Sequence, residues 1–123
     1  MKVTRILHSS VNIGDDPTAA DCLAFYRGVL GLADTGNRPD FGFAGAWLGA
    51  GDAQVHLIGG STGDGAIRPT DHHTCFGVAD LDGALAELAA LGVESFTIGE
   101  GDARQVFFAD PAGNTIELQV DRG

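Results

Sequence analysis

Residues 5–13 alternate between apolar and polar side chains, a pattern typical of a strand with one buried face. The apolar members are Leu7, Val11 and Ile13, and the polar members are His8, Ser10 and Asn12. A Gly-Asp-Asp-Pro turn follows, in which we expect Asp16 to cap a helix and Pro17 to take its first position. The helix should extend to Leu30, because apolar residues recur there at helical spacing. These residues are Cys22, Phe25, Tyr26, Val29 and Leu30.

The remainder of the first half predicts three short strands, at 32–35, 43–48 and 53–58. Glycine and aspartate separate them, and Gly49-Ala50-Gly51-Asp52 indicates a hairpin turn. Residues 59–70 are polar and glycine-rich and have no periodicity, so the boundary within the chain is expected in this stretch.

The second half repeats this order of elements. A strand is expected at 73–78, followed by a helix capped by Asp80 and ended by Gly92. The apolar stripe of that helix comprises Leu81, Ala84, Leu85, Leu88 and Leu91. Strands are expected near 94–98, 105–109 and 114–120. The turn Asp110-Pro111-Ala112-Gly113-Asn114 joins the last two, and we expect a structural role for Asp110.

Two constant offsets relate the halves. His8 and His73 are 65 residues apart (73 − 8), whereas His56 and Glu117 are 61 apart (117 − 56). The difference of four corresponds to about one helical turn more in the first half. Each half therefore predicts a β-α-β-β-β module, at 1–59 and 72–123, with 60–71 as the connector.

The repeat places four side chains with metal-binding capacity at two pairs of equivalent positions. These are His8 with His73, and His56 with Glu117. A pseudo-two-fold arrangement would bring all four together. Neighbouring residues of a strand face opposite sides, so His72 cannot share the face of His73, and we interpret His72 as an exposed bystander.

The same alternation predicts one polar and one apolar face for each sheet. The polar faces carry His8, Ser10, Asn12, Gln54, His56, His73, Cys75, Thr115, Glu117 and Gln119. We expect a substrate pocket lined by Ser10, Asn12, Phe43, Trp47, Gln54 and Cys75. Arg38 and Arg104 are candidates for holding an anionic substrate, Phe41 is a candidate for its apolar wall, and Cys75 is more often simply packed in such a position.

Composition limits the partners. The chain of 123 residues has a net charge of −10 and a pI near 4.4, which argues against nucleic-acid and anionic-membrane surfaces. No signal peptide is visible, and no apolar run approaches the roughly 18 residues of a spanning helix. Two cysteines are too few for a disulfide framework, so free thiols and a cytoplasmic location are expected.

Four segments together resemble the vicinal oxygen chelate superfamily, the glyoxalase/bleomycin-resistance/extradiol-dioxygenase fold. They are "LHSSVNIGD", "AFYRGVLGL", "HTCFGVADLDGALAELAALGV" and "FFADPAGNTIELQ". The resemblance implies an α+β fold of paired βαβββ modules, a cup-shaped curved mixed sheet and a divalent metal held by His8, His73 and Glu117. It also implies a homodimer in which modules of both subunits complete each site.

Two imidazoles and a carboxylate suit Zn, Ni, Co, Mn or Fe(II). His56 is then either a fourth ligand or a general base, with Glu117 also a candidate catalytic residue. The leading hypothesis is a glyoxalase-like lyase or isomerase acting on an oxygen-rich small molecule. The alternatives are an Fe(II) extradiol-type dioxygenase and a non-enzymatic drug-binding protein similar to bleomycin-resistance proteins.

Overall fold

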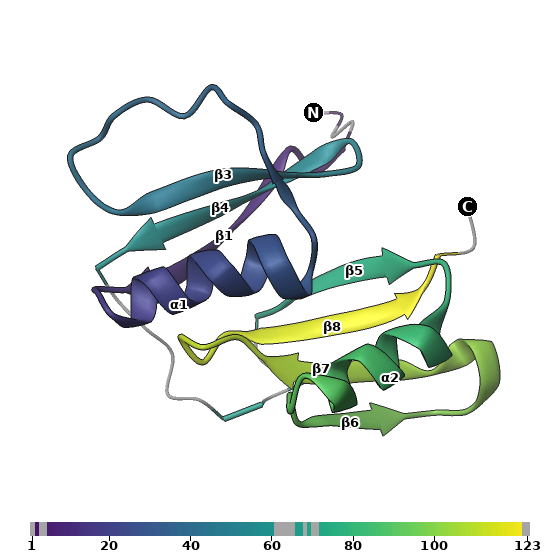
Figure 1. The fold of residues 1–123 in the computed structure, drawn as a ribbon. Helices are drawn as coiled ribbons and strands as arrows, with labels where there is room; N and C mark the ends of the chain where they lie inside the picture. Colours follow the sequence, from purple (N-terminus) through teal and green to yellow (C-terminus); the bar gives the residue numbers. More distant parts are fainter. Residues whose placement is uncertain (1, 3–4, 61–65, 68, 70–71, 122–123) are drawn as a thin grey trace. The chain divides into compact units, whose positions relative to one another are not determined.

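The computed structural model describes residues 2, 5–60, 66–67, 69 and 72–121. The chain divides into two compact units, Met1–Gly63 and Asp64–Gly123. In each unit a helix lies along one face of a four-stranded sheet (Figure 1). The α+β class predicted from the sequence is confirmed.

The first unit has the element order β-α-β-β-β. Its elements are β1 (His8–Gly14), α1 (Thr18–Ala24) with a π-helical turn (Phe25–Val29), β2 (Ala33–Asp34), β3 (Gly45–Ala50) and β4 (Ala53–Gly59). The strand order is β1-β4-β3-β2, with β1 parallel to β4 and the other neighbours antiparallel. The β3–β4 hairpin has the two-residue loop that the sequence predicts, and Gly51 adopts the left-handed φ of 58° that this turn favours.

The second unit repeats this topology. Its elements are β5 (Thr74–Val78), α2 (Leu81–Ala90), β6 (Ser95–Ile98), a short 3₁₀ turn (Gly101–Ala103), β7 (Gln105–Ala109) and β8 (Thr115–Val120). The strand order is β5-β8-β7-β6, and β5 is parallel to β8. Asp80 caps α2 as expected, since its side chain accepts a hydrogen bond from the Gly83 amide.

Strand pairing confirms the internal repeat at the level of single residues. Ser9 lies opposite Val55 in the first sheet, and Thr74 lies opposite Ile116 in the second. The first strands thus keep the offset of 65 (74 − 9) and the last strands the offset of 61 (116 − 55). The two offsets seen in the sequence therefore preserve one register in both sheets.

The apolar faces form the core. In the first unit, buried residues of the strands and of α1 with its π-helical turn are Ile13, Ala19, Cys22, Phe25, Tyr26, Ala46, Leu48, Val55 and Leu57. In the second, they are Leu81, Leu88, Val106, Phe108, Ile116 and Leu118. Burying such side chains contributes about 25 cal/mol per Å² of apolar surface.

Four expectations about the element ends were wrong. The first strand begins at His8, and Leu7 is 62% exposed because burial along β1 rises only toward Gly14. Pro17, not Asp16, occupies the cap position of α1, with no side-chain capping bond. The strand expected from Phe43 begins at Gly45 and leaves Phe43 exposed. Leu91 is 58% exposed because α2 ends at Ala90.

Asp110 has the structural role that the turn sequence predicts. Its Oδ1 accepts hydrogen bonds from the amides of Ala112 and Asn114, at 2.9 and 2.8 Å. Its Oδ2 accepts one from Asn114 Nδ2 at 2.8 Å. The side chain is buried, so it fixes the β7–β8 loop from inside.

Arg27 and Asp34 form a bidentate pair between the π-helical turn and β2, with N–O distances of 2.9 and 2.8 Å. The hydrogen bond from Arg27 lowers the pKa of Asp34. Replacing Arg27 by Gln should therefore raise the Asp34 pKa, measured by NMR titration of its carboxyl carbon. The stabilisation by the pair should be present above the ordinary pKa of 3.8 and disappear as the pH falls through the lowered value. An unchanged Asp34 pKa in R27Q, or an equal rise in R104Q, would contradict this assignment.

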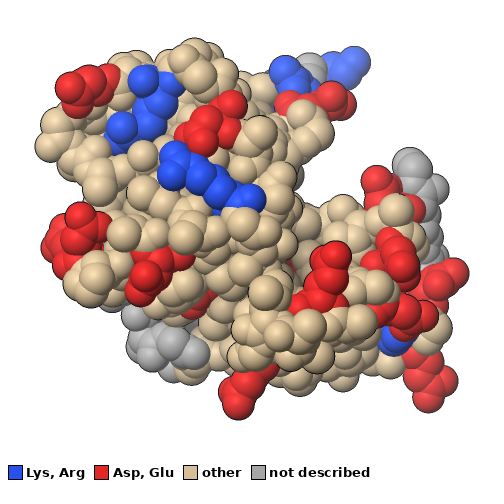
Figure 2. Space-filling model, viewed as in Figure 1, with Lys and Arg blue, Asp and Glu red and all other residues tan. Residues whose placement is uncertain are grey.

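No helix in the described part of the chain is long and apolar enough to cross a membrane. On the face shown in Figure 2, acidic side chains are spread over both units and basic side chains lie among them.

Candidate functional site

Glu117 is the most unusual side chain of the second sheet, because it is a carboxylate that is only 4% exposed. It lies in β8 opposite Cys75 of β5 and Phe107 of β7, so it occupies the middle of the polar face. Burying an ionised carboxylate is costly unless it is paired and hydrogen-bonded. The question is therefore which groups compensate Glu117.

Three donors surround this carboxylate. Gln119 Nε2 and Gln105 Nε2 donate to Oε1 at 2.7 and 3.0 Å, and His73 Nε2 lies 2.8 Å from Oε2. Burial raises the pKa of Glu117, but these hydrogen bonds together outweigh it and leave the pKa below its ordinary value. Glu117 is thus held ionised and oriented toward His73.

His73 lies directly before β5, and its side chain is 23% exposed. Its ring meets Phe107 edge to face, with the centroids 5.7 Å apart. His72 is exposed. The structure thus brings His73, the repeat partner of His8, to Glu117.

The first unit contains the matching pair. The rings of His8 and His56 are stacked, with their centroids 4.0 Å apart and an angle of 11° between planes. His56 Nε2 donates to Gln54 Oε1 at 2.9 Å. Burial, followed by the proximity of His8, lowers the pKa of His56, which favours the neutral imidazole. A neutral imidazole is the form that binds a metal or accepts a proton.

The His73–Glu117 pair fits a metal ion by its geometry. Two neighbouring ligand atoms that each lie about 2.1 Å from one metal ion are about 3 Å apart. His73 Nε2 and Glu117 Oε2 are 2.8 Å apart, which is close to that separation. Imidazole nitrogen and carboxylate oxygen also suit the first-row transition metals. Neither unit, in its described residues, gathers three metal-ligating side chains by itself. The convergence of both pairs on one ion stays a prediction.

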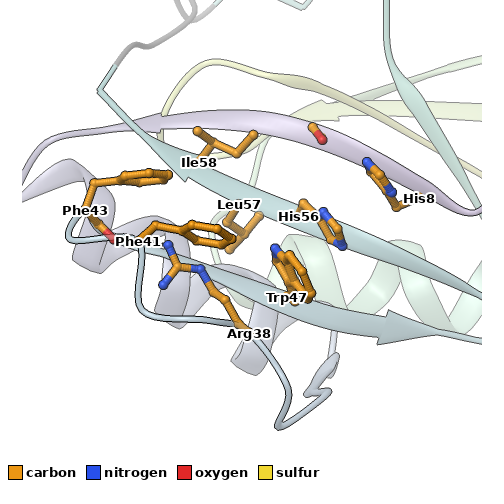
Figure 3. A pocket seen from close by; sticks show the side chains of 9 residues that line it. His8, Arg38, Phe41, Phe43, Trp47, His56, Leu57 and Ile58 are labelled. Carbon is orange, nitrogen blue, oxygen red and sulfur yellow. Dashed lines mark hydrogen bonds between the residues drawn. The ribbon is translucent and has the colours of Figure 1, made fainter.

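A pocket of about 240 Å³ opens beside the His8–His56 pair (Figure 3). It is lined by His8, Ser10, Arg38, Phe41, Phe43, Trp47, His56, Leu57 and Ile58. Trp47 lies opposite His56 in the β3–β4 pairing, and Ser10 lies opposite His56 in the β1–β4 pairing. The pocket therefore lies on the polar face of the first sheet, covered in part by the segment before β3.

Aromatic rings follow one another along this pocket. Trp47 stacks on His56 at 4.4 Å and 5°, so that Trp47, His56 and His8 form a continuous stack. Phe41 lies 6.1 Å from Trp47, and 5.6 Å from Phe43, to which it is nearly parallel. Figure 3 shows these rings side by side along the pocket.

Three of the six residues expected to line the pocket do so. Ser10, Phe43 and Trp47 line it, and so does Phe41. Gln54 does not line the pocket but accepts a hydrogen bond from His56. Asn12 is not among the lining residues either.

Cys75 belongs to the second unit and faces Glu117. It is a free cysteine, as is Cys22, in agreement with the sequence expectation. Cys75 is exposed and not fully packed as expected, but partial burial of its thiol, followed by Glu117, raises the thiol pKa to about 11, which disfavours the reactive thiolate.

Arg104 is engaged elsewhere: it pairs with Asp82 at 2.8 Å and donates to the Gly101 carbonyl. The prediction also missed Gln105, Leu57 and Ile58. The alternation of Gln105 with buried Val106 would have placed Gln105 on the polar face, but its contact with Glu117 needs the β7–β8 register.

Two βαβββ modules of equal register, each with a pair of side chains of metal-binding type on its polar face, define the class of this protein. The family model of the Glyoxalase/Bleomycin resistance protein/Dioxygenase superfamily matches residues 5–118, and the chain belongs to this superfamily. Its members commonly use a divalent metal and bind small molecules such as antibiotics.

Individual relatives are distant. Glyoxylase I 4 of Arabidopsis thaliana is 28% identical over 107 residues, which are 80% of this chain and 62% of the relative, so the chain spans less than two thirds of that protein. A glyoxalase family protein from Bacillus anthracis superposes with a TM-score of 0.81 at 22% identity, covering 99% of this chain and 98% of that one. TnmS3, an antibiotic binding protein from Streptomyces sp. CB03234, gives 0.73 at 22% identity and covers 98% of both chains. These structures show a common fold.

Proposed function

We propose that this protein is a metal-dependent enzyme of the glyoxalase type, a lyase or isomerase that acts on an oxygen-rich small molecule. One observation carries the proposal: a buried carboxylate, Glu117, is kept ionised and aimed at His73, while the equivalent positions of the other unit hold two histidines. A purely structural role would not require imidazoles and a carboxylate at repeat-related positions.

The residues that would hold the ion are His8, His73 and Glu117, with His56 either a fourth ligand or a general base. When bound, the ion supplies Lewis-acid polarisation of adjacent substrate oxygens. Gln105 and Gln119 fix the Glu117 carboxylate in one orientation, as the outer partners of metal ligands do in other proteins.

The proton chemistry would fall to His56. Its lowered pKa keeps the ring neutral near pH 7, so it is able to accept a proton from a substrate carbon or hydroxyl. Gln54 fixes the ring at Nε2 and leaves Nδ1 as the unprotonated nitrogen of the neutral form. Trp47 packs against the ring and limits the access of water on that side.

A second candidate function, non-catalytic binding of a small molecule, is supported by the aromatic pocket. Its rings would hold a ligand whether or not a metal is present. The similarity in fold to an antibiotic binding protein is compatible with this function.

The two functions differ in their need for metal. The test is the metal content of the purified protein by mass spectrometry, followed by titration of the metal-free protein with Co²⁺ under visible absorption. The enzyme proposal expects one ion per complete set of His8, His73 and Glu117. Absence of stoichiometric binding would overturn it and favour the binding protein.

A further inference from the structure

Arg38 stands out among the pocket residues because it is the only arginine or lysine among those that line the pocket. Its guanidinium carbon lies 5.1 Å from the Phe41 ring centroid and 5.5 Å from that of Phe43. Its Nη2 donates to the Phe43 carbonyl at 3.0 Å. Cation–π contacts and this hydrogen bond therefore fix the guanidinium at the pocket.

Arg38 differs in its pairing from two other arginines of the described chain. Arg27 and Arg104 each pair with an aspartate, whereas no described carboxylate lies within 4.0 Å of Arg38. This is notable in a chain with 17 acidic and 7 basic residues. A guanidinium has five N–H donors, and the Phe43 carbonyl takes only one of them. The other N–H groups of the Arg38 guanidinium are thus available to an anion.

The rings around Arg38 indicate the rest of the ligand. Phe41 and Phe43 are 48% and 51% exposed although they are large and apolar. With Trp47 they present flat surfaces along one pocket. Aromatic rings stack on such surfaces, with centroids about 4.5–7 Å apart. A pocket of about 240 Å³ is smaller than the roughly 300–1,000 Å³ of sites for drug-sized ligands, so one or two rings suit it.

We propose that this pocket binds a small planar aromatic molecule that carries a carboxylate, with Arg38 as the residue that binds the anionic group. A cationic ligand would meet the like charge of Arg38, and the net negative charge of the chain does not remove that local repulsion. This ligand would be the substrate class of the proposed enzyme, because His8 and His56 of the proposed metal site line the same pocket. Only that link to catalysis rests on the proposed function.

The test uses Trp47, the single tryptophan of the chain, as an internal probe. Its indole N–H gives one cross-peak in a ¹H–¹⁵N spectrum of the full, metal-free chain. The ligands are 2-naphthoate, 2-naphthamide, 2-naphthylmethylammonium and decahydro-2-naphthoate, which vary charge and planarity separately. We expect 2-naphthoate to shift the peak saturably, with a Kd at least about tenfold below those of the other three. Equal or tighter binding of the amide or the cation would overturn the anionic part of the proposal.

Variants then assign the contacts. R38Q should weaken 2-naphthoate at least about tenfold and leave 2-naphthamide unchanged, whereas R104Q, which removes an arginine paired elsewhere, should change neither. F41L should weaken both naphthyl ligands. If R38Q does not fold, F41L tests the proposal through its aromatic part. Unchanged binding of 2-naphthoate by F41L would overturn the proposed contact between Phe41 and the ligand ring.

The outcomes separate this inference from the proposed function. Stoichiometric Co²⁺ binding without binding of 2-naphthoate would overturn the inference of an aryl carboxylate ligand and leave the proposal of a metal-dependent enzyme in place. Binding of 2-naphthoate without Co²⁺ would overturn the enzyme proposal and retain the aryl carboxylate as the ligand of a binding protein.

Discussion

Replacing Glu117 by Gln should lower the affinity of the protein for Co²⁺ by at least about 100-fold, because it would remove the charged ligand of the proposed metal site and keep the shape of the side chain. Gln105 and Gln119 now donate to Glu117, and the amide oxygen of a glutamine would still accept a hydrogen bond. The fold should therefore persist while the site loses its negative charge. Titration of metal-free protein with Co²⁺, followed by visible absorption, measures the change.

Two matched controls accompany this prediction. E94Q removes a carboxylate from an exposed position just before β6 and should leave Co²⁺ binding unchanged. H73A should weaken Co²⁺ binding strongly, whereas H72A should not, since only His73 reaches Glu117. Loss of binding in H72A with retention in H73A would mean that the strand register assigned to this site is off by one residue.

Replacing Asp110 by Ala should destabilise the protein by about 3 kcal/mol, because three donors lose a buried, charged acceptor. The donors are two backbone amides and the Asn114 side chain, and the loop that they fix joins β7 to β8. D110N keeps one acceptor oxygen for the two amides and should cost less than half as much. Urea unfolding followed by Trp47 fluorescence and circular dichroism measures both.

The control for Asp110 is Glu100. This carboxylate lies at the start of the 3₁₀ turn, is exposed, and makes no side-chain capping bond. E100A should change the free energy of unfolding by less than about 0.5 kcal/mol. Equal effects of D110A and E100A would show that the loop does not depend on the buried carboxylate.

The sequence was sufficient for the order of elements and for the pairing of equivalent residues. Alternation identified the polar faces, and the repeat selected His73 over His72, because both signals depend on position along the chain alone. Helix ends were less predictable. Beyond Ala24 the helix continues as a π-helical turn, in which the Leu30 amide donates to the Phe25 carbonyl, and the helical spacing of the apolar residues does not indicate this change.

The surroundings of the site could be predicted only in part. Gln105 reaches Glu117 because β7 lies beside β8, and the sequence does not encode that register by a simple offset. Phe41 and Arg38 lie in an irregular segment without periodicity, so their place beside Trp47 follows from the path of that segment. From the scarcity of basic side chains the sequence named Arg38 and Arg104 equally as candidates for binding an anion, and only the structure distinguishes them, because Arg104 pairs with Asp82.

Each of the two proposed donor pairs, His8 with His56 and His73 with Glu117, lies within one module, and this has a consequence for how such proteins diverge. Recombination that exchanges a whole module transfers an intact donor pair, with its own strand register and its own supporting glutamine. A His/His module and a His/Glu module would thus be exchangeable units that carry different charges. Engineering can use the same division: joining two copies of the second module would give a chain with two carboxylates, and joining two of the first would give one with four imidazoles.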